Sequence, residues 1–143
     1  MSTYYMNWAA FELPETGIKD RTTHVVEIAH PEHEGITLVV YHEDFPPGKN
    51  LTQLAASRVA EEMARLKGYS VIERTETEWA GTPAVEVASR WRHEGKVIYQ
   101  RQAHLAVEGT WTYFALNGPF AAREACDAWL ERIRSSLRLR SDF

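Results

Sequence analysis

The chain has 143 residues, of which 44% are apolar and 25% are charged, and its formal net charge is −4 at pH 7. This composition is typical of a soluble globular protein, so we expect residues 1–143 to form a single domain. The acidic balance argues against a nucleic-acid partner, because phosphate-backbone binding needs a concentrated basic surface. The single cysteine, Cys126, excludes a disulfide within the chain.

Three short strands are predicted before the first helix, over residues 8–13, 22–28 and 35–43. Each is a run rich in β-branched, aromatic or other apolar residues. The third run has apolar side chains at both sets of alternating positions, which is typical of a strand covered on both sides. Pro46 and Pro47 then end the strand.

Residues 50–67 form the clearest predicted helix. Asn50 can cap the first free amides, and Gln53, three residues later, completes a variant of the capping box. Gly68 supplies the C-terminal stop. The apolar residues that recur at helical spacing are Leu51, Leu54, Ala55, Val59, Met63 and Leu66.

A further strand is predicted over residues 69–79, followed by a block of three strands over residues 82–116. The two turns of this block, His93–Lys96 and Val107–Thr110, each place a glycine between runs of β-forming residues, which is a strong hairpin pattern. After the block, Gly118 and Pro119 are predicted to start a last helix, with proline at its tolerated first position. One side of that helix carries Ala122, Cys126, Trp129, Ile133 and Leu137.

The middle strand of the block separates two kinds of side chain. Gln100 and Gln102 share one face with Ile98 and His104, whereas the alternate positions are mostly apolar. The apolar face can pack a core, and the amide-bearing face is left for another role. The sequence does not decide whether a helix covers the amides or leaves them on an open surface.

The order of three strands, a helix, four strands and a helix predicts an α+β fold. Its sheet is mainly antiparallel, with about six to seven strands and two main helices. Two helices of about four turns cannot easily cover both faces of such a sheet. We therefore expect part of one face to stay open as an amphipathic binding surface that carries valine, threonine, tyrosine and glutamine.

No motif for catalysis is found. The chain contains no G-x-S-x-G, no phosphate-binding loop and no G-x-G-x-x-G, and the segment 30–33 has metal-ligating residue types without a second half to close a site. We therefore expect no catalytic residue, no cofactor and no metal. A hydrolase or metal enzyme built around His24, His42 and His104 is the enzymatic alternative.

The first fifteen residues have neither the basic region nor the apolar region of a signal peptide. No run of about 18 apolar residues is present to cross a bilayer. We therefore expect a cytoplasmic protein with no stable membrane association of its own.

Four segments resemble the DcrB-like family, which shares its fold with PsbP and Mog proteins. They are F-E-L-P at 11–14 with D-R-T at 20–22, L-K-G-Y at 66–69, A-G-T-P-A at 80–84, and W-R-x-E-G-x-x-x-x-Q-R-Q-A at 91–103. Together they span nearly the whole chain. The resemblance implies a strongly curved antiparallel sheet.

Short cytosolic members of the family are similar to the effector-associated (Eag) chaperones of type VI secretion, which hold the N-terminal transmembrane segments of PAAR-type effectors. The resemblance implies a non-enzymatic chaperone or adaptor, a homodimer, and a client-binding cradle on the early strands, a helix and a strand glutamine. Arg58 stands where a glutamine is expected, and Thr23 where an aliphatic residue is expected. The alternative is an immunity or regulatory module of the same fold that binds a folded partner. The implied client-binding residues are Thr23, Val25, Thr37, Val39, Tyr41, Arg58, Gln100 and Gln102.

Overall fold

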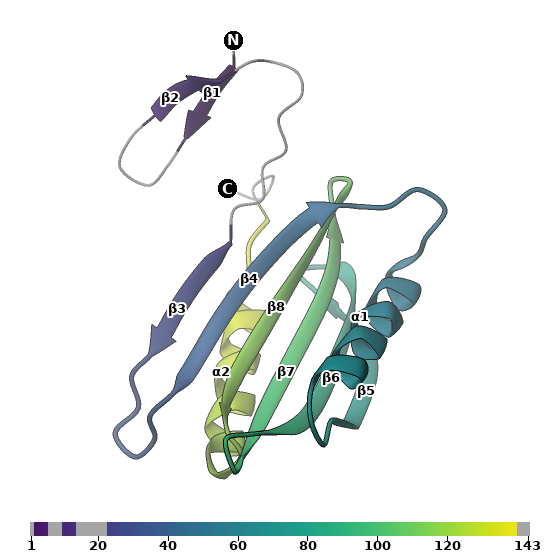
Figure 1. The fold of residues 1–143 in the computed structure, drawn as a ribbon. Helices are drawn as coiled ribbons and strands as arrows, with labels where there is room; N and C mark the ends of the chain where they lie inside the picture. The colour runs from purple at the N-terminus through teal and green to yellow at the C-terminus, as the bar shows by residue number, and fades with distance from the viewer. Residues whose placement is uncertain (1, 6–9, 14–22, 140–143) are drawn as a thin grey trace.

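The computed structural model describes residues 2–5, 10–13 and 23–139 (Figure 1). The strands are β1 (Ser2–Tyr5), β2 (Ala10–Leu13), β3 (His24–Ile28), β4 (Ile36–Asp44), β5 (Ser70–Trp79), β6 (Thr82–His93), β7 (Lys96–Val107) and β8 (Thr110–Pro119). The helices are α1 (Leu51–Arg65) and α2 (Arg123–Ser136), the second preceded by a single 3₁₀ turn, η1 (Phe120–Ala122).

Six strands form one curved sheet in the order β3-β4-β8-β7-β6-β5, and every neighbouring pair is antiparallel. The β1 and β2 strands form a separate antiparallel pair. This arrangement confirms the predicted α+β class, the antiparallel sheet and the two main helices.

The capping residues predicted for the first helix are confirmed. The backbone amide of Gln53 donates to Asn50 Oδ1 at 2.8 Å, and the amide of Asn50 donates to Gln53 Oε1 at 2.9 Å, so both halves of a capping box are present. Gly68 takes a φ of +66° just after the helix, in the left-handed region that glycine enters at little cost. The helix itself ends at Arg65, two residues before the predicted end.

Several boundaries differ from those predicted. The strand β1 was not predicted, and the first residues of the predicted strands 8–13 and 22–28 lie outside the described residues. Pro119 is the last residue of β8 and precedes η1, so the prediction that it opens the last helix is wrong. The proline ring favours extended backbone before the turn, and the α-helix begins at Arg123.

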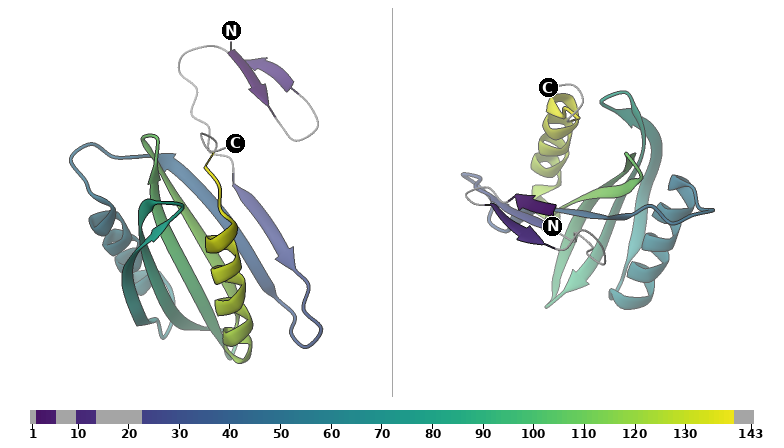
Figure 2. Two further views of the ribbon diagram at one scale, coloured as in Figure 1. Left: turned by 180° about the vertical axis from the view of Figure 1, so that it is seen from behind. Right: turned by 90° about the horizontal axis from the view of Figure 1, so that it is seen from above.

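One face of the sheet packs against α2 (Figure 2). This core joins alternate residues of the central strands to one side of α2, and its buried members include Ile36, Trp79, Tyr99, Ala103, Leu105, Phe114, Leu116, Cys126 and Leu130. Gly118 lets α2 approach closely, because a Cβ there would lie 2.9 Å from the sulfur of Cys126. The apolar face predicted for the middle strand is therefore the α2 face.

The opposite face packs against α1 over only part of its width. Buried Leu54 and Ala55 hold α1 to the sheet, where they join apolar clusters that include Val85, Val87 and Trp111. Figure 2 shows α1 near the β5–β6 side, whereas β3 and β4 lie at the other edge of the sheet. Among the described residues, no helix covers the α1 side of β3 and β4, so this half of the face is open.

Candidate functional site

The open half of the α1 face carries a strip of side chains from β3 and β4. Strand register pairs Val25 with Val39 and Glu27 with Thr37, and directly paired residues point to the same face of a sheet. Tyr41 lies on that face too, because its ring stacks on Tyr113 below α1 with centroids 4.8 Å apart. We call Val25, Glu27, Thr37, Val39 and Tyr41 the open strip.

The open strip brings together four of the predicted client-binding residues. Val25 is 65% exposed, and Thr37, Val39 and Tyr41 are each half-buried. Thr23, a fifth predicted residue, is exposed and immediately precedes β3. The strip is therefore an accessible surface with an aliphatic centre and an aromatic end.

Arg58 lies on the side of α1 that faces the open strip. Its guanidinium carbon lies 6.0 Å from the ring centroid of Tyr41 and 5.4 Å from that of Tyr113, within the range of a cation–π contact. Its Nε lies 3.3 Å from Glu62 Oε1, and one terminal nitrogen lies 3.6 Å from Glu61 Oε2. The structure thus places the Arg58 side chain beside the strip, where two carboxylates of its own helix hold it in position.

Gln100 and Gln102 lie beneath α1, not on the open strip. They are 6% and 1% exposed. The Nε2 of Gln102 donates to Gln100 Oε1 at 2.8 Å and to Glu62 Oε1 at 2.8 Å. The expectation that these amides share an open surface with Val25 and Val39 is therefore wrong, because α1 covers this part of β7 and supplies Glu62 as the polar partner of Gln102.

His104 completes this buried polar row. It is fully buried, its Nε2 lies 2.9 Å from Gln102 Oε1, and the indole nitrogen of Trp111 donates to its Nδ1 at 3.1 Å. Because Nδ1 must accept from Trp111, the ring is neutral with its proton on Nε2. Burial, with smaller contributions from Arg58 and Arg74, lowers the pKa of His104 to about 3.

Glu62 was missed by the sequence analysis, which placed Met63 on the buried side of the helix instead. In the structure Met63 is 56% exposed and Glu62 is 1% exposed. Burial raises the pKa of Glu62, and the charge of Arg58 opposes that rise. The sequence did contain a signal for Glu62. It lies four residues after Arg58, and residues at i and i+4 lie side by side on a helix, so the two could have been predicted to form an ion pair.

Replacing Gln102 with alanine is expected to destabilise the fold by about 2–4 kcal/mol, because it leaves Glu62, Gln100 and His104 without a shared partner. Urea unfolding monitored by tryptophan fluorescence measures this loss. Normal stability together with lost client binding would instead assign Gln102 to the binding surface. Thr75→Ala on the exposed part of β5 is the control for a surface polar truncation.

The three histidines of the enzymatic alternative do not form one group, because His104 lies on the other face of the sheet from His24 and His42. His24 and His42 pack edge to face with ring centroids 6.0 Å apart. His24 pairs with Val40, which packs on the α2 core, whereas His104 points to the α1 face. Within the described ranges, no group of three His, Cys, Asp or Glu residues is arranged to hold a metal.

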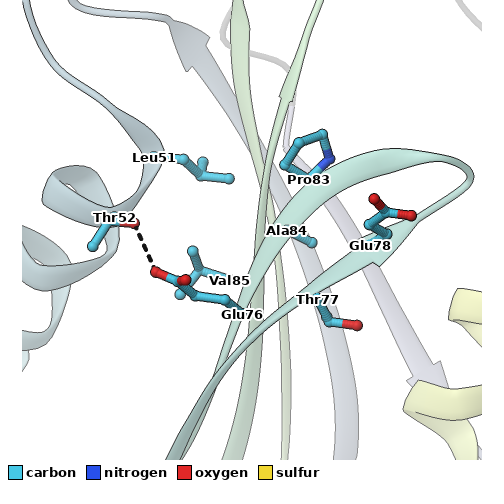
Figure 3. Close-up of a pocket in the computed structure, with 8 residues that line it drawn as sticks. All are labelled: Leu51, Thr52, Glu76, Thr77, Glu78, Pro83, Ala84 and Val85. Atoms are coloured by element: carbon cyan, nitrogen blue, oxygen red, sulfur yellow. Dashed lines mark hydrogen bonds between the residues drawn. The ribbon is translucent and has the colours of Figure 1, made fainter.

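A pocket of about 440 Å³ lies between the start of α1 and the β5–β6 hairpin (Figure 3). Thr52 donates to Glu76 Oε1 at 3.2 Å across it, and Leu51 and Pro83 contribute apolar surface. It contains none of the predicted client-binding residues.

Of the helices that the structure describes, neither is long and apolar enough to cross a membrane.

Comparison with known proteins agrees with this fold. The model of the DcrB family matches residues 9–136. No curated protein sequence matches the chain.

Solved structures share the architecture at low sequence identity. PA94 from Pseudomonas aeruginosa, described as a protein of unknown function and putative regulator, has a TM-score of 0.82 at 18% identity, over 98% of this chain and 97% of that one. LpqN of Mycobacterium tuberculosis, involved in cell envelope biogenesis, has a TM-score of 0.59 at 11% identity, over 85% of each chain. The cyanobacterial PsbP of Synechocystis has a TM-score of 0.58 at 14% identity, over 96% of this chain and 91% of that one. The PsbP-like fold expected from the resemblance is confirmed.

Proposed function

The chain belongs to the DcrB family, and from this membership and the open strip we propose that it is a non-enzymatic chaperone or adaptor. Its client would be the hydrophobic N-terminal transmembrane segment of a PAAR-type effector of type VI secretion, which it would bind and shield in the cytoplasm. The observation that carries the proposal is an accessible strip with an aliphatic centre beside a helix, in which Val25 is 65% exposed.

A transmembrane helix in water needs its apolar side chains covered, while its backbone hydrogen bonds stay internal. The open strip supplies Val25 and Val39 for aliphatic contact and Tyr41 for aromatic contact. Thr37 adds a hydroxyl of the kind that bonds between membrane helices, worth about 0.6–2 kcal/mol. These are the side chains that a neighbouring membrane helix would offer.

The width of the sheet leaves room for a client helix beside α1. Packed helices lie about 8–10 Å apart, and neighbouring strands about 4.8 Å apart, so adjacent helices on a sheet are offset by two strands. Since α1 packs over β6 and β7 and its Leu54 reaches Trp111 and Tyr113 of β8, a helix beside it would lie over β4 and reach β3. The client would then lie on the open strip and contact Arg58 of α1 at its side.

The buried amides have a different part in this proposal. Gln100 and Gln102 hold α1 in place through Glu62, and α1 in turn positions Arg58. We therefore propose Val25, Thr37, Val39, Tyr41 and Arg58 as client contacts, with the two glutamines as support. Thr23 lies at the margin of this contact surface.

Co-expression with a candidate client tests the proposal. A tagged N-terminal segment of a PAAR-type effector is expected to stay in the soluble fraction with this protein and to precipitate without it. If the segment precipitates in both cases, the chaperone proposal is wrong. Capture of the folded part of the effector without its apolar segment would favour the immunity or regulatory module instead.

The homodimer implied by the resemblance is a separate proposal. Light scattering of the purified protein tests it, because a monomer has a mass of 16.4 kDa. A mass near that value at micromolar concentration would contradict the dimer.

A further inference from the structure

Carboxylates stand at both ends of the open strip, and we infer that the bound segment is an apolar helix flanked by basic residues at both of its ends. This inference rests on the proposed function and adds the charge pattern of the client.

Glu27 marks one end of the strip. It is exposed, it pairs in register with Thr37, and Val25 and Val39 form the next pair toward the centre. Glu43 marks the other end, because it follows Tyr41 by two residues on β4 and therefore points to the same face. Within the part of the chain that the structure describes, neither Glu27 nor Glu43 forms an ion pair or a side-chain hydrogen bond.

Strand register places Glu43 beside the aromatic end of the strip. Glu43 pairs with Trp111, whose ring centroid lies 5.0 Å from that of Tyr113. Tyr113 in turn stacks on Tyr41. Consistent with this position, burial is the largest cause that raises the pKa of Tyr113, Arg58 opposes it, and the negative charge of Glu43 adds to the rise.

Of the cations that the structure describes near the strip, neither Arg58 nor Lys96 pairs with Glu27 or Glu43. Arg58 is shared between Glu61 and Glu62, so this side of α1 already has two acidic partners for one guanidinium. Lys96 lines a pocket beyond the Thr37 end together with Glu34. A client with acidic flanks would meet like charge at both ends of the strip, whereas a client with basic flanks would meet opposite charge.

The two carboxylates lie closer together than the two ends of a membrane-spanning helix, and long basic side chains can bridge the difference. Thr37, which pairs with Glu27, and Glu43 are six residues apart on β4, which corresponds to about 20 Å of strand and about 13 residues of helix. A membrane-spanning segment of about 20 residues is about 30 Å long. Lysine or arginine at its two ends can reach back along the apolar stretch, because the charge sits on a long flexible stem.

Two synthetic peptides provide the test. They share one leucine–alanine core of about 20 residues, and one has two lysines at each end where the other has two glutamates. Each carries a dye, and fluorescence anisotropy measures binding to the full chain at low and at physiological salt. The lysine-flanked peptide is expected to bind about tenfold more tightly, as a few exposed ion pairs allow, with a smaller ratio at the higher salt.

A charge-swapped protein makes the test specific. The double variant Glu27→Lys with Glu43→Lys is expected to reverse the preference. Its matched control, Glu73→Lys with Glu78→Lys on β5 at the far edge of the sheet, is expected to keep it. Circular dichroism verifies that both variants are folded.

The outcomes separate this inference from the proposed function. Equal binding of the two peptides, or reversal by the control variant, would overturn the charge pattern and leave the chaperone proposal standing. Failure of both peptides to bind would overturn the proposed function, and the charge pattern with it.

Discussion

Replacing Val25 with asparagine is expected to weaken binding of the client segment by about tenfold or more, whereas the same replacement at Val26 leaves binding close to that of the wild-type chain. Val25 lies on the open strip, paired with Val39, and Val26 points to the opposite face of the same strand. Placing an amide against an apolar helix without a hydrogen-bond partner costs about 1–3 kcal/mol in proteins. A difference of 1.4 kcal/mol corresponds to a tenfold change in affinity.

The two variants form a matched pair. Val25 and Val26 are 65% and 48% exposed, so neither replacement removes a buried side chain. Both keep the net charge, and both place the same poor β-former on the same edge strand. Titration of a labelled client peptide gives the two dissociation constants. Equal weakening at both positions, or full binding by the Val25→Asn variant, would remove the open strip from the binding surface.

The free energy of unfolding is expected to fall steeply as the pH is lowered from about 6.5 toward 3, because of His104. Its pKa is about 3 in the folded protein, against 6.5 as the ordinary value. Between these two pH values, His104 is protonated in the unfolded chain but stays neutral in the folded protein, so acid favours unfolding. The stability contributed by neutral His104 is complete above pH 6.5. It falls by on the order of 5 kcal/mol by the lower end of this range.

Glu62 acts in the opposite direction. Because its pKa is raised in the folded protein, it takes up a proton before the unfolded chain does as the pH falls, which adds stability toward acid. The two groups belong to one hydrogen-bonded row with Gln102 between them, so their contributions must be separated by mutation.

Urea titrations at several pH values measure the dependence. The His104→Gln variant is expected to be less stable at pH 7 but to lose less stability per pH unit between 6.5 and 3. His93→Gln is the control for loss of an imidazole, because the side chain of His93 is 69% exposed. An unchanged slope in the His104→Gln variant would show that another group controls the acid sensitivity.

Much of the fold follows from local sequence patterns. The two Gly-containing turns at 93–96 and 107–110 and the capping box of Asn50 and Gln53 each depend on neighbouring residues only, and each is present in the structure. Alternation along residues 96–107 also assigned the two faces of β7 correctly. The side that carries Tyr99, Ala103 and Leu105 packs in the α2 core.

The position of α1 could not be read from such patterns. Alternation shows that Gln100 and Gln102 share a face, but it does not show which strands a helix covers on that face. Glu62 could have indicated which strands α1 covers, since a carboxylate on the buried side of a helix requires a polar partner beneath it. That partner is Gln102, 40 residues away in the chain. The same placement of α1 leaves β3 and β4 uncovered, which is why the early-strand residues remain available.

We propose that a client helix lies on the open strip, on the α1 side of β3 and β4. Site-specific photocrosslinking to a co-expressed client segment tests it most directly, with the photoreactive residue placed in turn at positions 25, 26 and 52. A strong crosslink is expected from position 25, and none from position 26 on the α2 side or from position 52 beside the pocket at the start of α1. A crosslink from position 26 or 52 without one from position 25 would contradict it.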